Sequence, residues 1–561
     1  MLKKERACLL FILVIASSLR LYNLNKYDLW YDELITTKFS YQRVRADSHA
    51  YNIPRSSIFL NKLKVDPNAP FYFILVHGYS FLFGSGKSLR ILSLLLSVLT
   101  LWVFYRVARL FLRQTESLLS VALMAASPVH IWYAQEARGY SLECLMAIIM
   151  IFVWIEGFRH HKDRYWIVLC ITSLVAVFTT YFSIFLLVAL GVICIFKDYR
   201  VHLKKWLFTI VGMALVSSLY LKFTDTRINE TIKNLWISSL PQGSFWQTFG
   251  VFALGYSANP PLLTAGIVFS LCLFISGAYF YYRKNKTNAI FLVTATLLPL
   301  TITSILSWII SPFYLTRKML IVSPFFYILL TKGLWGINKK IYRIAGITIL
   351  TIMIALSLMN YYKNYIIELP DGKDFYPGVH ARKNYSRLLN NIKINLKEKD
   401  IIIGTDVQSF LSLLYYFGFP SDATELVHFY FFPEFMYKFQ RQSFIDMAKT
   451  NPATSFEGLA SSSQTQDKTN SLHALYYPKN SPHATVKEIK LDTLDYKRVW
   501  LVSSTWNKYG LYEPNSKAVR EFVSLFFRRK LIKKSDTFTL ELYEKDFNAS
   551  SSDRGEEITR K

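Results

Sequence analysis

The chain has few of the residues on which disulfide, metal and nucleotide sites depend. Its 561 residues include only five cysteines, all inside apolar runs, so neither a disulfide framework nor a cysteine zinc site is supported. The histidines at His130, His160 and His161 show no ligand spacing to one another, and no metal signature stands out. A glycine-rich phosphate-binding loop is also lacking, which argues against a nucleotide donor or ATP-driven activity. We therefore expect no cofactor and no metal.

Acidic residues are also scarce, with 38 Asp and Glu against 65 Lys and Arg, and the formal net charge is +27. Such a balance can indicate a nucleic-acid partner. Here, however, the basic residues gather in short loops between apolar runs, as in Arg159, Lys162 and Arg164 or in Lys339, Lys340 and Arg343. Short loops rich in Lys and Arg mark the cytoplasmic side of a membrane protein. The charge therefore indicates topology, and we expect no nucleic-acid partner.

Apolar residues dominate the chain, at 52% hydrophobic and 16% aromatic, which exceeds the usual make-up of a soluble protein. Several runs approach the roughly 20 residues needed to cross a bilayer. These runs are Leu89–Val107, Pro261–Tyr282, Ala289–Ile310 and Met319–Leu334. The sequence predicts a polytopic α-helical protein of the plasma or inner membrane, in contact with its lipids.

We place eleven spans with a cytoplasmic N-terminus and an extracytoplasmic C-terminal domain. Every predicted cytoplasmic loop then carries a basic cluster. The run 165–196 is too long for one crossing and too short for two, unless Thr179-Thr180-Tyr181 turns at the surface. The predicted spans are 7–22, 88–108, 117–131, 141–158, 165–178, 182–196, 206–222, 261–282, 288–310, 319–336 and 342–359.

Composition divides the chain into a transmembrane part at 1–360, an extracytoplasmic α/β domain at 361–547 and a disordered tail at 548–561. Within the first part, residues 23–69 form a polar and aromatic outer loop. The apolar stretch 70–85 has no room to cross independently, so we expect a helix lying in the membrane interface.

Short elements are expected in the C-terminal domain. Lys399–Gly404 and Arg498–Ser503 resemble buried strands, and Thr537–Tyr543 alternates like a half-exposed strand with Phe538, Leu540 and Leu542 on one face. Tyr385–Leu396 and Lys517–Phe527 have helical apolar spacing.

An acidic pair, Asp32-Glu33, lies in the first outer loop between Trp30-Tyr31 and Leu34-Ile35. Adjacent acids are common in loops, so the ordinary interpretation is a solvated pair without a catalytic role. Carboxylates at an apolar boundary are costly to desolvate, and one held there can serve as a general base. Asp32 and Glu33 are therefore candidate catalytic residues.

A second group follows Ser127-Pro128 in Gln135-Glu136-Ala137-Arg138-Gly139-Tyr140, on the outer side between two spans. Gln135 and Arg138 are three residues apart, and Glu136 and Tyr140 are four apart, so each pair is expected to share a helix face. Local charge at a helix end is the alternative interpretation.

Cations on the outer side complete the candidate set. Arg90 begins a span after the loop that contains Asn68, and Arg317-Lys318 interrupts the positive-inside pattern in the short outer loop Ser311–Met319. A guanidinium can hold a lipid phosphate in bidentate fashion. Snorkelling of Arg90 and simple headgroup contact by Arg317 and Lys318 are the alternatives.

Taken in order, these stretches resemble the bacterial and archaeal branch of the protein O-mannosyltransferase and aminoarabinose-transferase group, in the GT-C glycosyltransferase superfamily. The most specific part is the Gln-Glu-Ala-Arg-Gly-Tyr block at 135–140, and the resemblance covers roughly residues 10–360. Two departures exist. The family's His-Pro-Pro is Asn68-Ala69-Pro70 here, and its later Arg-Tyr is Arg317-Lys318.

The resemblance implies a membrane glycosyltransferase that moves a sugar from a polyprenyl-phosphate donor to an acceptor hydroxyl on a protein, lipid or glycan. Asp32 resembles the family's catalytic base and Glu33 its neighbour in the acceptor site. Arg90 and Arg138 resemble groups that hold the site or the donor phosphate, and Arg317 resembles the arginine that meets the lipid phosphate. A single displacement would invert the anomeric configuration.

Two other classes of protein fit the sequence less well. A lipid-linked glycan polymerase or ligase would place its large loop between late spans and would lack the early Asp-Glu. A glycolipid transporter would show charged residues in mid-span and internal symmetry, and neither is visible in the sequence.

Overall fold

The computed structural model forms two compact units. The helical unit comprises residues 1–26, 39–41 and 60–381, and the sheet unit comprises 27–38, 42–59 and 382–561. The structure describes residues 3–45, 54–66, 68–160, 162–196, 200, 203–224, 243–310, 312–367, 375–376, 378–397, 400–404, 409, 412–413, 415, 427–431, 472–476, 485–489, 497–504, 520, 523–524, 527–534 and 538–545.

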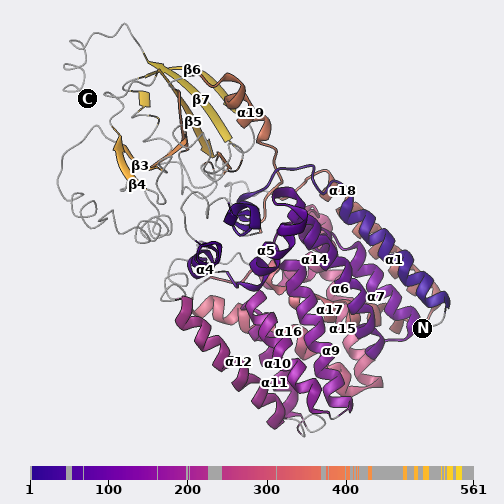
Figure 1. The fold of residues 1–561 in the computed structure, drawn as a ribbon. Helices are drawn as coiled ribbons and strands as arrows, with labels where there is room; N and C mark the ends of the chain where they lie inside the picture. Colours follow the sequence, from indigo (N-terminus) through magenta and orange to yellow (C-terminus); the bar gives the residue numbers. More distant parts are fainter. Residues whose placement is uncertain are drawn as a thin grey trace. The chain divides into compact units, whose positions relative to one another are not determined.

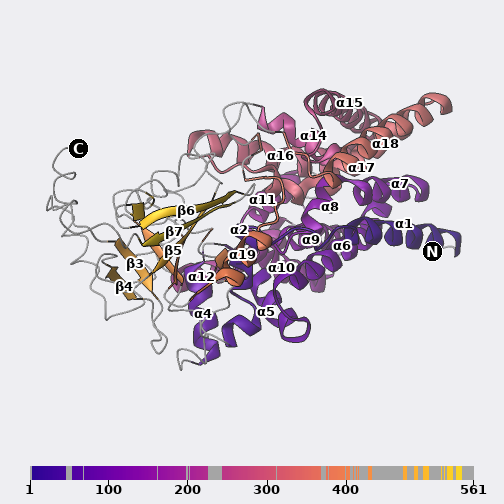
Figure 2. The same cartoon turned by 90° about the horizontal axis from the view of Figure 1, so that it is seen from above.

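Long apolar helices build the helical unit, and in both ribbon views they run alongside one another (Figure 1, Figure 2). Its helices are α1 (Lys3–Leu21), α5 (Phe71–Phe83), η1 (Gly86–Ser88), α6 (Leu89–Phe111), α7 (Gln114–Ala126), α8 (Pro128–Ala134), α9 (Tyr140–His160), α10 (Asp163–Thr179), α11 (Ser183–Ile195), α12 (Leu203–Thr224), α14 (Ser244–Leu254), α15 (Pro260–Lys284), α16 (Lys286–Ile309), η3 (Thr316–Val322), α17 (Ser323–Gly336) and α18 (Lys340–Tyr362). α4 (Arg55–Val65) begins in a segment of the sheet unit and ends in one of the helical unit.

Seven helices in the described part of the chain are long and apolar enough to cross a membrane, or eight if the bent pair α7–α8 is one span. The protein is therefore a multi-pass membrane protein, but the predicted count of eleven is not confirmed. The predicted break in the run 165–196 is confirmed, because α10 ends at Thr179 and α11 begins at Ser183. The helix expected at 70–85 is also present as α5, and at 13 residues it is short for a crossing.

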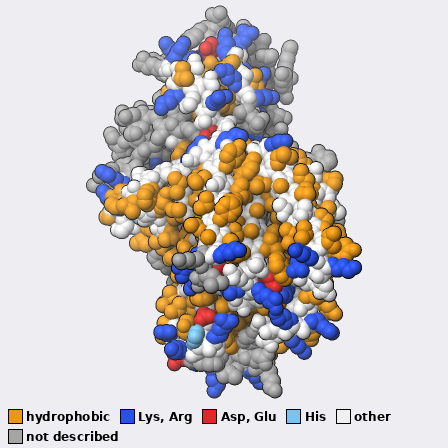
Figure 3. Space-filling view, turned by 90° about the vertical axis from the view of Figure 1, so that its right-hand side faces the viewer, with side chains coloured by type: hydrophobic (Ala, Val, Ile, Leu, Met, Phe, Trp, Pro, Cys, Tyr) orange, Lys and Arg blue, Asp and Glu red, His pale blue; other side chains and the backbone are white. Residues whose placement is uncertain are grey.

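Burial separates the centre of the helical unit from its periphery. The segment Thr316–Gly336 is almost wholly buried, whereas α12 exposes most of its apolar surface. Side chains such as Phe208 and Trp308 are 78% and 85% exposed, as expected where lipid replaces water. Figure 3 shows hydrophobic side chains over a broad area of this unit, with Lys and Arg gathered along its borders.

Small residues let α15 and α17 cross closely. A Cβ at Gly277 would overlap the carbonyl oxygen of Leu329, and one at Gly333 would overlap that of Leu273. Such close backbone approach through glycine is typical of helix packing in membranes.

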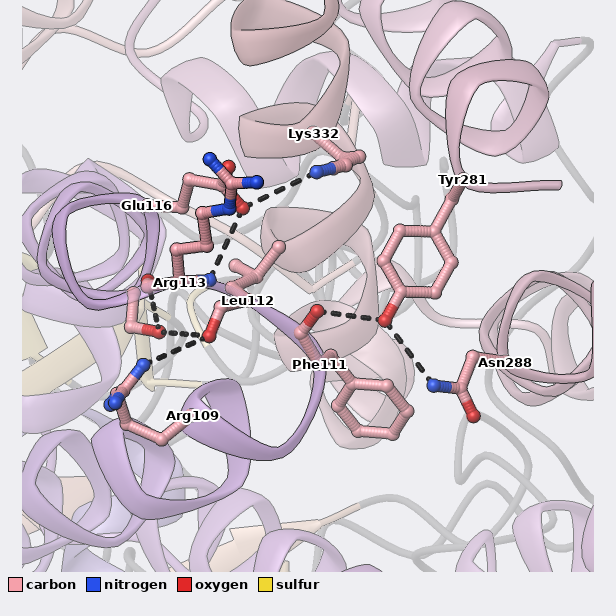
Figure 4. A network of polar contacts seen from close by, with 9 residues as sticks. Arg109, Phe111, Leu112, Arg113, Glu116, Tyr281, Asn288 and Lys332 are labelled. Atoms are coloured by element: carbon pink, nitrogen blue, oxygen red, sulfur yellow. Dashed lines mark hydrogen bonds and ion pairs between the residues drawn. The ribbon is translucent and has the colours of Figure 1, made fainter. Parts of the chain in front are cut away.

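A buried polar network fixes the turn between α6 and α7 (Figure 4). The Glu116 carboxylate accepts a 3.3 Å hydrogen bond from the Arg113 backbone N–H and lies 3.4 Å from Lys332 Nζ of α17. The Tyr281 hydroxyl of α15 donates to the carbonyl oxygen of Phe111 at 2.7 Å. The turn is thereby tied to two helices that lie far from it in sequence.

The sheet unit contains a mixed sheet whose described strands follow the order β4-β3-β2-β1-β5-β7-β6. β1 pairs in parallel with β2 and β5, and the remaining neighbours are antiparallel. The unit also contains α2 (Tyr31–Thr37) and α19 (Ser386–Asn395). The strands are β1 (Asp400–Gly404), β2 (Val427–Phe431), β3 (Leu472–Tyr476), β4 (Thr485–Ile489), β5 (Arg498–Ser504), β6 (Phe527–Lys534) and β7 (Phe538–Lys545).

The strands and helix expected at 399–404, 498–503, 537–543 and 385–396 are confirmed as β1, β5, β7 and α19. Phe538, Leu540 and Leu542 pack together in one core, as predicted. The expectation of a half-exposed β7 is wrong, because its other face is buried as well. There the Glu541 carboxylate lies 2.6 Å from Arg520 Nε, which compensates its buried charge.

Most of the helix expected at 517–527 and the whole tail 548–561 lie outside the described residues.

Candidate active site

The acidic pair lies on α2, a short helix of the sheet unit, and its two carboxylates differ in environment. Glu33 is fully buried, and its Oε2 accepts a 3.2 Å hydrogen bond from the backbone N–H of Trp30, which precedes the helix. Asp32 is only partly buried. Glu33 therefore caps the beginning of α2, whereas Asp32 keeps surface open to a substrate.

A third acid, Asp28, connects this segment to α19 within the same unit. Its Oδ2 accepts hydrogen bonds of 2.8 Å from the backbone N–H groups of Tyr385 and Ser386. The Tyr385 hydroxyl donates to the carbonyl oxygen of Leu29, and burial raises the pKa of this phenol, so it stays a donor at neutral pH. Asp28 thus fixes the segment that leads into α2.

The Gln-Glu-Ala-Arg-Gly block does not continue a helix. α8 ends at Ala134 and α9 begins at Tyr140, so residues 135–139 form a turn between them. The expectation that Gln135 and Arg138, or Glu136 and Tyr140, share a helix face is therefore wrong.

Side chains from three other elements hold this turn. The Ser93 hydroxyl of α6 donates to the Arg138 carbonyl oxygen at 3.2 Å, and Trp132 Nε1 donates to Glu136 Oε1 at 2.5 Å. Arg138 Nη2 lies 3.4 Å from Asn68 Oδ1, on the loop that leads into α5. Asn68 therefore contacts the site directly.

The second pair of cations lies on η3, a buried 3-10 helix that runs into α17. Lys318 Nζ lies 2.7 Å from Glu143 Oε1 on α9 and 5.0 Å from the centre of the Tyr140 ring. Arg317 is 8% exposed and donates through Nη1 to the Gly378 carbonyl oxygen at 2.8 Å. The sequence predicted the two cations, but Glu143, the buried carboxylate partner of Lys318, was missed.

These cations form one group, which we call the cation cluster: Arg138, Arg317 and Lys318. The charges of Arg138 and Arg317 both act on Lys318, and Glu136 and Arg317 both act on Tyr133. Within the cluster and its two acids, Glu136 and Glu143, one positive charge is in excess. The structure therefore brings together five of the six predicted outer-side residues in the helical unit: Glu136, Arg138, Tyr140, Arg317 and Lys318.

Tyrosines line the cluster. The Tyr133 and Tyr256 hydroxyls lie 2.9 Å apart, and the Tyr133 ring packs 4.4 Å from that of Tyr140. The Tyr256 ring meets Tyr376 edge to face at 4.9 Å. Burial raises the pKa of Tyr256 and Tyr376 above the ordinary phenol value, so both hydroxyls stay neutral donors. No signal in the sequence distinguishes Tyr133, Tyr256 and Tyr376 from the other tyrosines, whereas Tyr140 was among the predicted residues.

Arg90, the sixth predicted residue, holds the chain that leaves α1. It is 2% exposed, and its Nη1 donates to the Leu24 carbonyl oxygen at 2.9 Å. Gln135 Nε2 donates to the carbonyl oxygens of Arg20 and Tyr22, each at 2.8 Å. Carbonyls at a helix end lack helical partners, so Gln135 caps α1, whereas Arg90 holds the chain just beyond the helix end at Leu21.

Comparison with known families finds one matching model. Residues 67–221 match the family described as dolichyl-phosphate-mannose-protein mannosyltransferase. This segment contains the turn at 135–139 and Arg90, and the match confirms the glycosyltransferase class expected from the sequence. Among curated proteins, no match is found.

Solved structures share the fold over almost the whole chain. ArnT from Cupriavidus metallidurans in the apo state has a TM-score of 0.55 at 13% identity, covering 95% of this chain and 97% of that one. The same protein bound to undecaprenyl phosphate has a TM-score of 0.53 at 11% identity, covering 97% and 98%. These likenesses confirm the GT-C type of fold, with membrane helices and a small C-terminal sheet domain.

Proposed function

We propose that this chain, a GT-C superfamily glycosyltransferase similar to mannosyltransferases and aminoarabinose transferases, moves a sugar from a polyprenyl-phosphate donor to an acceptor hydroxyl. Transfer takes place on the outer face of the plasma or inner membrane, by one displacement with inversion at the anomeric carbon. The acceptor is a protein, lipid or glycan. The ArnT structure with bound undecaprenyl phosphate, from a protein of the same fold, supports a lipid-phosphate donor.

The cation cluster is the observation that carries this proposal. Arg138, Arg317 and Lys318 are largely buried, and with Glu136 and Glu143 they leave one positive charge in excess. That excess suits a phosphodiester with one negative charge. Burial strengthens the attraction, because charges interact more strongly away from water. As the sugar leaves, charge builds on the phosphate, and cations already in place stabilise it without reorganisation.

The partly buried Asp32 is the proposed general base. Its carboxylate takes the proton of the acceptor hydroxyl while that oxygen bonds to the anomeric carbon. The bond between this carbon and the phosphate oxygen breaks, and the lipid phosphate leaves with the electron pair. Glu33 keeps α2 in shape by capping it, so its contribution to acceptor binding is indirect.

Arg90 and Gln135 act as positioning residues. Gln135 holds carbonyl oxygens where α1 ends, and Arg90 holds the Leu24 carbonyl oxygen just beyond that end. Both residues thereby restrain the chain that continues toward the first outer loop. In this proposal Arg90 does not contact the donor phosphate. Of the two roles expected from the sequence, Arg90 therefore keeps only that of holding the site.

The experiment uses the purified full chain in nanodiscs, with a panel of polyprenyl-phosphate sugars and a membrane extract as the acceptor source. We expect release of polyprenyl phosphate from at least one lipid donor and no release of nucleotide from nucleotide sugars, both detected by mass spectrometry. Arg317→Gln should lower release at limiting donor, whereas Lys340→Gln, which removes an exposed cation from the same unit, should not.

Two results would contradict the proposal. Turnover of a nucleotide sugar would place the donor in another class. Movement of intact glycolipid across the bilayer, without cleavage, would indicate a transporter.

A further inference from the structure

One surface of the sheet unit is strongly basic. α19 and β6 together carry seven Lys and Arg residues and no Asp or Glu in their sequences. Every residue of β6 after Phe527 is exposed, and β6 lies at the edge of the sheet. We use the name basic face for four of these cations and two exposed aliphatic side chains: Arg387, Lys393, Arg528, Lys533, Ile394 and Leu531.

The register of the sheet places the two elements on one side. Leu531 pairs with Leu542 and Lys533 with Leu540, and residues directly opposite in a pair point to the same face. Leu540 and Leu542 face the core beneath α19. Lys533 Nζ accordingly lies 3.0 Å from Asn391 Oδ1 on α19. Figure 1 shows α19 beside β6 and β7.

The amphipathic pattern of α19 turns its remaining side chains outward. Leu388, Leu389 and Ile392 enter the core, which leaves Arg387 and Lys393 exposed. Figure 3, viewed from the side on which α19 lies in Figure 1, shows Lys and Arg prominent on this unit. The cations of α19 thus extend those of β6 into one surface.

Protection of an edge strand explains only part of this charge. Cations on an edge strand discourage pairing with other chains, and Arg529 and Lys530 also pair with Glu541 and Glu544 of β7. Arg387 and Lys393, however, lie on a helix, where no open edge needs protection. Edge protection therefore does not explain the charge on α19.

We propose that the basic face docks on anionic lipid headgroups. Ile394, which follows Lys393 on α19, is 81% exposed, and Leu531 is exposed on β6 between Arg528 and Lys533. Cations mixed with exposed aliphatic side chains suit a membrane interface better than a soluble polyanion. The spans of the same chain tether the unit to a bilayer, so docking is intramolecular and needs little affinity per contact. Each Lys or Arg near an anionic surface contributes about 1 kcal/mol, or roughly fivefold in the docking equilibrium.

The test places a fluorescent amino acid at Ile394 of the full chain, reconstituted in nanodiscs. Quenching by brominated lipid measures contact with the bilayer. We expect quenching in nanodiscs that contain brominated phosphatidylglycerol, little in pure brominated phosphatidylcholine, and several-fold weaker quenching when salt is raised from about 0.1 to 0.5 M.

Charge removal supplies the matched comparison. The variant Arg387→Gln, Lys393→Gln, Arg528→Gln and Lys533→Gln should lose most of the quenching, with an unchanged unfolding temperature because all four side chains are exposed. The control variant removes four exposed cations of the helical unit and should quench like the parent: Lys162→Gln, Arg164→Gln, Lys284→Gln and Lys286→Gln.

Three outcomes would overturn the proposal. The first is an absence of quenching in anionic nanodiscs, and the second is equal quenching in phosphatidylcholine alone. The third is a response of the label to soluble polyphosphate but not to brominated phosphatidylglycerol, which would make the partner a soluble polyanion.

Discussion

The pair formed by Lys318 and Glu143 lets structural and donor-binding roles be separated. Lys318→Met leaves the Glu143 carboxylate, which is 2% exposed, without the cation that lies 2.7 Å from it. Glu143→Leu leaves Lys318 as a largely buried cation, 20% exposed, without its carboxylate. Either single change therefore leaves a buried charge without its opposite partner, whereas the double change removes both charges.

The expected magnitudes follow from burial. Breaking a buried ion pair by removing one partner costs about 3–5 kcal/mol, whereas replacing both by apolar side chains is often close to neutral. Because Lys318 retains some exposure, we expect about 3 kcal/mol for each single variant and less than about 1 kcal/mol for the double variant. A loss of about 3 kcal/mol corresponds to roughly 2–4 °C in the unfolding temperature of a chain of this size.

Thermal unfolding of the purified chain in nanodiscs measures stability, and transfer per folded molecule measures function. Stability should return in the double variant, which also keeps one positive charge in excess because one cation and one acid are removed. Transfer at limiting donor should nevertheless not return, because the Lys318 ammonium itself is no longer available to the donor phosphate. Single variants that unfold at the parent temperature would refute the account of the pair as mutual charge compensation. A double variant with full transfer would remove Lys318 from donor binding.

Three further changes test local packing and capping. Glu33→Ala should cost about 1 kcal/mol through loss of the helix cap, read as faster hydrogen exchange across α2, and unchanged exchange would refute the cap. Gly277→Leu should reduce the yield of folded protein sharply, because α15 and α17 must separate to accommodate the side chain. The control Gly78→Ala should fold normally, because nothing lies within 4 Å of the added Cβ. Equal yields of the two variants would contradict the close crossing of α15 and α17. Asp28→Asn should lower the stability of the sheet unit by about 1–2 kcal/mol, because a neutral amide accepts more weakly from Tyr385 and Ser386, and equal unfolding temperatures would show that the charge is unimportant.

Local sequence was sufficient for most elements. Hydrophobic runs predicted the long helices, and the polar Thr179-Thr180-Tyr181 marked the break between α10 and α11. The number of membrane crossings could not be predicted from the sequence. The length of a short helix does not decide whether that helix crosses the membrane. α11 has 13 residues, and the 19 residues of α1 include Arg20 and four charged residues at its beginning.

The site was predicted in its parts but not in its connections. The residue types at 135–140 were found, yet helical spacing was assumed where the chain turns, since no rule of local spacing reveals a turn held by tertiary contacts. Lys318 and Glu143 lie 175 residues apart, so their pairing depends on the fold. Asp28 and Tyr385 are even more distant in sequence, and no pattern in either segment indicates the other.

The distinction between Asp32 and Glu33 also required the structure. Adjacent acids look equivalent in sequence, but on a helix they point in different directions, and only one is buried as a cap. The sequence therefore located the candidate base to within two residues, and burial selects Asp32.

The measurement that tests the central claim most directly is single-turnover transfer from a preferred polyprenyl-phosphate sugar, comparing the parent chain with Asp32→Asn at equal folded abundance. We expect the rate of transfer to fall by about 10²–10⁴-fold, the usual contribution of a general base, while donor binding to the cation cluster is unchanged. A rate within about tenfold of the parent would contradict the assignment of Asp32 as the base.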